Sequence, residues 1–194
     1  HAGETYLVFG APGGFPASLD LSTLDGTNGF VLTGIDVRDH SGDHVSAAGD
    51  VNGDGFDDLL IGARHAAPGG DEEAGEAYVV FGAADDFSAT FDVSTLDGAN
   101  GFVLEGIDPH DEASWSASAA GDVNGDGFDD LIIGAPFADP AGNDLAGESY
   151  VVFGAPSGFP ARLDLASLDG AAGSAIPAIA ESDHLGTSVH SPGN

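Results

Sequence analysis

The sequence predicts an all-β fold built from units of four short antiparallel strands, and three observations lead to that prediction. The 194 residues include 31 Gly and 10 Pro, which favour turns and leave few periodic apolar stretches for long helices. A ten-residue string, Gly-Asp-Val-Asn-Gly-Asp-Gly-Phe-Asp-Asp, occurs unchanged at 49–58 and at 121–130. Short, continuously apolar segments such as Leu-Leu-Ile and Tyr-Val-Val-Phe lie between turn-rich stretches, as strands do.

The sequence repeats with a fixed period, which is set by the starts of the two identical strings at 49 and 121, and the repeat extends well beyond them. The segment Tyr-Leu-Val-Phe-Gly at 6–10 returns as Tyr-Val-Val-Phe-Gly at 78–82 and at 150–154. The segment 24–32 returns at 96–104 and, in degraded form, at 168–176. A period of this size indicates one supersecondary unit per repeat, which needs neighbours to bury its faces.

Four strands are expected in each repeat, in the order Val45–Ala48, Leu59–Gly62, Tyr78–Phe81 and Phe102–Glu105. The two middle strands are continuously apolar rather than alternating, so both of their faces should be covered by neighbouring sheets. Four-stranded units stacked radially form a β-propeller, which removes exposed sheet edges by closing a ring. The sequence therefore predicts β-propeller blades of four antiparallel strands.

The chain should hold two complete repeats with partial ones at both ends. We divide it into a partial blade (1–36), a repeat (37–108), a second repeat (109–180) and the start of a further blade (181–194). Propellers close with about four to eight blades, so the chain is too short to close alone. It begins with His1 rather than Met, so we expect a mature product or a segment of a longer protein. The tail, 183–194, should supply an innermost strand that the head lacks, and copies could pair head to tail.

The charge balance limits the partners. There are 33 acidic residues against three Arg and no Lys, for a formal net charge of −30. Such a field repels phosphate backbones and anionic membrane surfaces, so we expect no nucleic-acid partner. No apolar run approaches the length of about 18 residues that a membrane span needs, so we expect no membrane insertion. Part of the acidity also fits a protein made for high salt. Cys is absent, so no disulfide holds the fold, and cations are the natural partners.

The repeated string places oxygen-bearing side chains at loop positions 1, 3, 5 and 9, with Gly at position 6. These are Asp50, Asn52, Asp54 and Asp58 in the first loop and Asp122, Asn124, Asp126 and Asp130 in the second. That spacing lets one short loop wrap Ca²⁺, a hard cation that takes six to eight oxygen ligands. An EF-hand would also need Glu at position 12, where this chain has Ile61 and Ile133 inside an apolar strand. The loop therefore joins two strands.

The combination of this loop with its flanking motifs resembles the FG-GAP repeats of integrin α-chain β-propellers. Phe-Gly occurs at 9–10, 81–82 and 153–154, and Gly-Ala-Pro at 134–136, while 62–64 departs as Gly-Ala-Arg. In that family the loop binds calcium through the side chains at positions 1, 3, 5 and 9 and the backbone carbonyl at position 7. The resemblance thus implies two calcium sites that also use the carbonyls of Phe56 and Phe128. Family propellers have seven blades, and this chain supplies fewer than three.

Other candidate residues give weaker patterns. His40 and His44 are four residues apart, but the surrounding sequence is turn-like and the second repeat has no His at the equivalent positions. Trp115 stands where the first repeat has Asp43, and its ring could stack on a sugar or pack inside the protein. We interpret acidic pairs such as Glu72 and Glu73 as solvated loop residues by default.

Two loop residues have no assigned ligand role. Asp57 and Asp129 occupy position 8, next to the last carboxylate of each loop. We expect both to face solvent or to lie just outside the ligand set.

We expect a non-catalytic, calcium-binding propeller segment of a secreted, extracellular or cell-surface adhesion protein, because everything that repeats is structural. Its partners would be calcium and a protein or glycan ligand. The alternative is part of a propeller lectin or of an enzyme that acts on polysaccharide, with its site on loops that differ between repeats. Those loops are Arg38–His44, Arg64–Glu73, His110–Ser116 and Pro136–Leu145.

Overall fold

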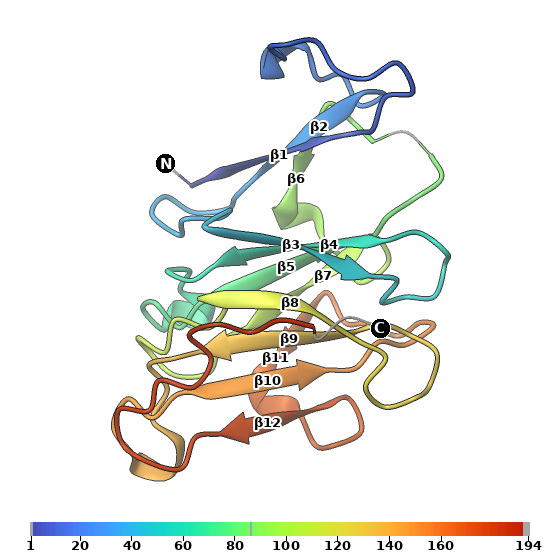
Figure 1. Ribbon diagram of the computed structural model, residues 1–194. Coiled ribbons are helices and arrows are strands. Elements are labelled where there is room, and N and C mark those ends of the chain that lie inside the picture. The colour runs from blue at the N-terminus through green and yellow to red at the C-terminus, as the bar shows by residue number, and fades with distance from the viewer. Residues whose placement is uncertain (1, 86, 192–194) are drawn as a thin grey trace.

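The computed structural model describes residues 2–85 and 87–191, and over these residues the protein is all-β (Figure 1). Its strands form three sheets that are stacked along the molecule. The first sheet contains β1 (Glu4–Val8), β2 (Gly29–Thr33) and β6 (Thr90–Asp92). The central sheet contains β3 (His44–Gly49), β4 (Asp58–Ala63), β5 (Glu76–Val80), β7 (Gly101–Glu105) and β11 (Arg162–Asp164). The last sheet contains β8 (Ser116–Gly121), β9 (Asp130–Ala135), β10 (Glu148–Val152) and β12 (Gly173–Pro177).

Helical structure within the described residues is limited to short 3₁₀ turns. They are η1 (Leu21–Thr23), η2 (Pro68–Gly70), η3 (Val93–Thr95), η4 (Pro140–Gly142) and η5 (Leu165–Ser167). No helix in the described part of the chain is long and apolar enough to span a membrane.

The predicted four-stranded blade is confirmed. In the central sheet β3, β4, β5 and β7 pair antiparallel in that order, with Ile61 opposite Tyr78 and Tyr78 opposite Val103. The last sheet repeats the same order with β8, β9, β10 and β12. The ends of these strands lie within two residues of the predicted ends. The chain therefore forms part of a β-propeller.

A fifth strand, which the sequence did not predict, joins neighbouring sheets. The short strand β11 follows β10 in the chain but pairs parallel with β7 of the central sheet, and β6 pairs in the same way with β2. Arg162, at the start of β11, contacts the carboxylates of Glu76 and Glu105 in the central sheet. Each of these two short strands thus comes from one repeat and pairs with the sheet of the preceding repeat.

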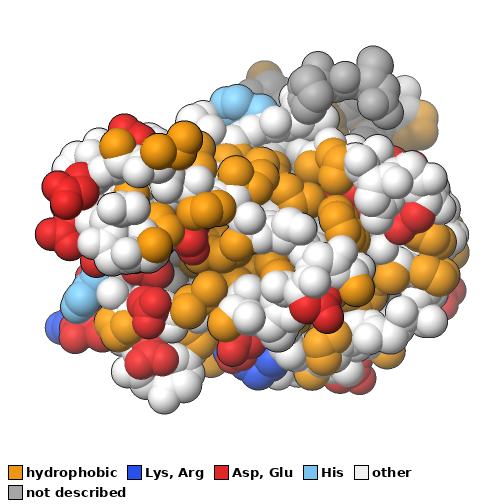
Figure 2. Space-filling view, turned by 90° about the horizontal axis from the view of Figure 1, so that it is seen from below, with side chains coloured by type: hydrophobic (Ala, Val, Ile, Leu, Met, Phe, Trp, Pro, Cys, Tyr) orange, Lys and Arg blue, Asp and Glu red, His pale blue; other side chains and the backbone are white. Residues whose placement is uncertain are grey.

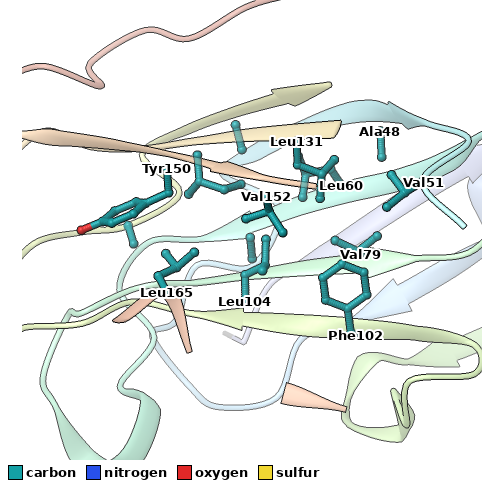
Figure 3. Close-up of a cluster of buried hydrophobic side chains, with 14 of the residues drawn as sticks. Ala48, Val51, Leu60, Val79, Phe102, Leu104, Leu131, Tyr150, Val152 and Leu165 are labelled. Atoms are coloured by element: carbon teal, nitrogen blue, oxygen red, sulfur yellow. The ribbon is translucent and has the colours of Figure 1, made fainter. Parts of the chain in front are cut away.

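Two apolar cores fill the seams between the sheets. One lies between the central and last sheets and contains Leu60 and Phe102 together with Leu131 and Tyr150 (Figure 3). The other lies between the first and central sheets. In both seams an aromatic ring from the repeat that follows stacks on the preceding sheet. Phe159 lies 4.5 Å from Phe102, measured between ring centroids.

One repeated glycine is required by close backbone packing. Gly101 begins β7 with a φ of 136°, and a Cβ there would lie 2.1 Å from the carbonyl oxygen of Val79. Gly29 and Gly173 occupy the same place in the other two sheets. A side chain would therefore displace the outer strand, which accounts for the fixed glycine before each outer strand.

The tail 181–187 repeats the connection that precedes each inner strand. Leu185 N donates to Ala146 O at 2.9 Å, as Ala113 N donates to Ala74 O in the preceding repeat. Val189 is buried, but no strand forms over 181–191, and residues 192–194 lie outside the described part of the chain. The division into blades at 36, 108 and 180 stays a prediction.

Truncating the seam core should cost far more stability than the same change on an open face. Leu60→Ala should lower the free energy of unfolding by about 2–5 kcal/mol, because Leu60 is fully buried between two sheets. Ile132 holds the equivalent place in the last sheet but is only half-buried, so Ile132→Ala should cost clearly less. Urea unfolding of both variants measures the difference. Equal losses would contradict the seam assignment.

Candidate metal centres

The two candidate loops connect the inner strands of their sheets. Residues 50–57 join β3 to β4, and residues 122–129 join β8 to β9. Both loops project from the same end of the stacked sheets, on the right in Figure 1. Each loop is closed by an aspartate that forms the first residue of the next strand. The predicted strand-to-strand loop is therefore confirmed.

Within the first loop, the side chains at positions 1, 3 and 5 turn toward the loop's own amides. The Asp54 N–H donates to Asp50 Oδ1 at 3.0 Å and to Asn52 Oδ1 at 2.9 Å. Gly55 N donates to Asp50 Oδ2, and Phe56 N donates to Asp54 Oδ1, each at 2.9 Å. Three side-chain oxygen groups thus converge on one turn of backbone.

The second loop has the same arrangement. Asp126 N donates to Asp122 Oδ1 at 3.0 Å and to Asn124 Oδ1 at 2.9 Å. Phe128 N donates to Asp126 Oδ1 at 3.0 Å. Since identical sequences form identical turns, the loop geometry is set locally.

The aspartate at position 9 stands apart because it is buried. Asp58 Oδ2 accepts from Val51 N at 2.9 Å, and Asp58 Oδ1 accepts from Gly82 N at 2.8 Å. Burial raises the pKa of Asp58 to about 6, and the negative charges of Asp54 and Asp50 act in the same direction. The two amide hydrogen bonds favour the charged form and offset part of this rise.

Asp130 is bound in the same way, to Val123 N at 2.8 Å and Gly154 N at 2.9 Å. Burial raises its pKa as well. Gly82 and Gly154 are the glycines of the repeated Phe-Gly motif, so in both repeats the loop carboxylate binds the backbone of that motif.

The residues fit a hard cation by their chemistry. Each loop offers three carboxylates and one amide oxygen, which are the donors calcium prefers. Yet no group of three or more acidic or His side chains among residues 2–85 and 87–191 is arranged so that it could hold a metal ion. Asp50, Asn52 and Asp54 accept hydrogen bonds from loop amides, while Asp58 accepts from Val51 N and Gly82 N.

Position 8 has a role that sequence reasoning missed. The side chain of Asp129 reaches the first loop, where its Oδ2 accepts from Asp50 N at 2.9 Å. A Cβ on Gly49 would lie 2.3 Å from the same oxygen, so the glycine before the loop leaves room for it. The equivalent Asp57 is exposed. No signal within one repeat could separate these two aspartates, since both stand in identical strings.

The loops that differ between repeats gather at the opposite end of the sheets. Arg64 pairs with Asp43 at 3.1 Å and with Glu112 at 2.9 Å, which joins three of the four variable loops. A cleft of about 610 Å³ lies beside them, with His40, His65 and Glu72 among its lining residues. The fourth loop also contacts the tail, where His184 Nδ1 lies 3.1 Å from Pro136 O.

The remaining candidates are also placed. The ring of Trp115 packs edge-on against Phe137 at 5.2 Å, with the Arg64 guanidinium 4.4 Å from its centre, so it is a packed ring rather than an open sugar platform. His40 lies against the ring of His65 at 4.6 Å. His44 has a buried Nδ1 without a hydrogen-bond partner among the described residues.

Comparison with known proteins identifies the repeat. The FG-GAP repeat family matches residues 42–80 and 114–152, which cover both loops, their flanking strands and the Tyr-Val-Val strands. Integrin alpha-PS2 of Drosophila melanogaster is 31% identical over 137 residues, or 68% of this chain and 9% of that protein. Integrin alpha-5 of Xenopus laevis is 29% identical over 163 residues, or 80% of this chain and 14% of that protein.

An enzyme is also among the relatives. Phosphatidylinositol-glycan-specific phospholipase D of Dictyostelium discoideum is 29% identical over 147 residues, or 70% of this chain and 14% of that protein. The chain thus spans between 9% and 14% of the length of these three relatives.

Stacked four-stranded sheets with an acidic loop between the inner strands define a segment of β-propeller. The chain carries two FG-GAP repeats, and the resemblance to integrin α-chains is confirmed.

Acid should stabilise the protein when calcium is withheld. Burial raises the pKa of Asp58 to about 6 and that of Asp111 to about 7, so the folded state binds these protons more tightly than the unfolded chain. This contribution to stability is full below the unfolded pKa and is lost as pH rises through the folded pKa. In excess chelator the melting temperature should therefore rise as the pH falls from about 7.5 to about 5.5.

Two comparisons check this prediction. Asp111→Asn should flatten the upper part of the rise, because it removes the group with the higher pKa. If Asp58 is a calcium ligand, saturating calcium should weaken or reverse the trend, since protons and the cation would then compete for it. A chelated protein whose melting temperature falls over this range would show that the carboxyl pKa values do not govern its stability.

Proposed function

We propose that this chain is a calcium-stabilised, non-catalytic propeller segment of an extracellular or cell-surface adhesion or interaction protein. The single observation that supports it best is the pair of identical loops, whose four oxygen-bearing side chains recur at the same positions and with the same hydrogen bonds. One calcium ion per loop would be held by the side chains at positions 1, 3, 5 and 9 and by the carbonyl of Phe56 or Phe128.

The cation would supply positive charge where the chain concentrates negative charge. Asp50, Asp54 and Asp58 repel one another when ionised, and burial adds to the cost for Asp58. Because Asp58 also binds Gly82 N, an ordered loop would hold β4 against the end of β5. Calcium would in this way act as a structural cross-link in a protein that has no disulfide.

The variable loops are the proposed contact region for a protein or glycan ligand. They lie at the end of the sheets away from the calcium loops, beside the cleft lined by His40 and Glu72. The integrin α relatives favour an adhesion role. The phospholipase relative and this cleft keep a lectin or enzyme segment as the second candidate. A glycan array combined with polysaccharide turnover assays would separate the two.

Both open faces of the stack expose residues whose counterparts in the other repeats are buried in the seams. Tyr6 is 44% exposed, whereas Tyr78 and Tyr150 at the equivalent positions are buried. Val123 is 56% exposed, whereas its counterpart Val51 is buried. Figure 2, which views the molecule from below, shows hydrophobic side chains gathered across the middle of the last sheet's face. We therefore propose that further blades cover these faces, supplied by self-association or by the remainder of a longer propeller.

Calcium uptake tests the central proposal. Calorimetry should show two calcium ions per chain, with dissociation constants of roughly 10⁻⁵ to 10⁻³ M, the range of weak extracellular modules. At free calcium 100 times the dissociation constant, each site should add about 2.7 kcal/mol of stability, so chelation should lower the melting temperature. Asp54→Ala together with Asp126→Ala should abolish both effects.

The matched control removes two exposed acidic side chains outside the two candidate calcium loops, as Asp144→Ala together with Glu181→Ala. This variant should keep both calcium ions. Uptake that is absent from the intact chain, or unchanged in the loop variant, would sink the proposal.

Light scattering tests the open faces. The purified 194-residue chain should associate as its concentration rises, because its end sheets expose apolar residues that seams elsewhere bury. Val123→Asp should reduce the association by placing a charge on one open face. Val37→Asp, on an exposed loop away from these faces, should leave it unchanged. A compact monomer that melts cooperatively at all concentrations would refute the need for a covering blade.

A further inference from the structure

The two loops touch each other across the seam between the central and last sheets. Asp50 N donates to Asp129 Oδ2 at 2.9 Å, and Asp129 N donates back to Asp50 O at 3.2 Å. Ala155 N donates to Val51 O at 3.0 Å. Asp129 of the second loop therefore hydrogen-bonds to the peptide groups on both sides of Asp50, the first residue of the first loop.

These contacts involve the positions that would bind calcium. Asp50 is position 1 of the first loop, and Asp129 lies between Phe128 and Asp130, which are positions 7 and 9 of the second. Gly53 has a φ of 75°, and a Cβ there would lie 2.3 Å from the Phe128 ring, so that ring rests on the first loop. A change of conformation at residues 128–130 would therefore act directly on Asp50, through the two hydrogen bonds between Asp129 and Asp50.

We infer that Asp129 is a positioning residue that couples the two loops, so that calcium at one loop raises the affinity of the other. This inference rests on the proposed calcium binding. The first cation would fix the shared hydrogen bonds, and the second loop would then have less backbone left to order. Because coupling between binding sites is reciprocal, each loop should raise the affinity of the other by the same factor.

Calorimetric titration with calcium chloride on the full chain tests the coupling. Asp126→Ala leaves only the first loop competent, and Asp54→Ala leaves only the second. The product of the two association constants of the intact chain should exceed the product of the two single-loop constants by about fivefold or more. With Asp129→Ala added to each protein, the two products should become equal.

Asp57→Ala is the matched control. It removes the same side chain from the same string, but Asp57 is exposed and its carboxylate bonds to no other loop among the described residues. The coupling factor should survive this change. Asp129→Asn keeps a hydrogen-bond acceptor for Asp50 N, so it should retain most of the coupling while Asp129→Ala loses it. Melting curves in chelator check that every variant is folded.

The outcomes separate the two proposals. If Asp54→Ala and Asp126→Ala leave calcium uptake unchanged, the proposed calcium function fails. If each removes one ion but the products of constants are equal in the intact chain, the loops are independent and the coupling is wrong. If the coupling factor persists in Asp129→Ala, or is lost equally in Asp57→Ala, the assignment to Asp129 is overturned.

Discussion

A buried carboxylate at the start of the second strand is the constraint on which each blade depends. Asp58 binds the amide of Val51 at the start of its loop and the amide of Gly82 beyond the end of β5. It therefore fixes the loop and two strands at once. Gly82 has no room for a side chain, because a Cβ would lie 2.5 Å from Asp57 O. The acidic loop and the Phe-Gly motif look independent in the sequence, but they are two halves of one hydrogen-bonded unit.

This constraint divides the molecule into a fixed end and a variable end. At the end that carries the acidic loops, identical residues recur because they make the same hydrogen bonds between carboxylates and backbone amides in each repeat. At the other end, the connections carry different residues in each repeat, and the Arg64 ion pairs with Asp43 and Glu112 have no equivalent in the next repeat among the described residues. Those connections can vary without disturbing the blades, which is why the proposed ligand contact lies there rather than beside the acidic loops.

Most of the fold was predictable, because its information is local or repeated. Continuous apolar segments such as Leu59–Gly62 identify strands covered on both faces, and the constant spacing of the repeats identifies the unit that stacks. The strand β6 was missed, because Thr90–Asp92 carries no apolar pattern and its partner is the edge of the preceding sheet. Its existence depends on that edge and not on its own sequence.

The candidate sites show the same limit. The candidate ligand positions within one loop follow from spacing, so Asp50, Asn52, Asp54 and Asp58 could be proposed from the sequence. The contact of Asp129 with Asp50 could not, because it joins residues 79 apart and arises only when two blades pack together. The sequence also left open whether Trp115 faces a sugar or the interior, and its contacts with Phe137 and Arg64 decide that question.

The borrowed fifth strand has a consequence for how such chains change in length. Since β6 and β11 occupy the same place one repeat apart, a recombination event that joins any residue to its equivalent in the next repeat preserves every sheet. The sequence change is the gain or loss of one whole repeat, and the break can fall at any point within it. The identical strings at 49–58 and 121–130 mark one such pair of equivalent points. Blade number in this architecture is therefore a heritable trait that unequal crossing-over can alter in single steps, without an intermediate that has a broken blade.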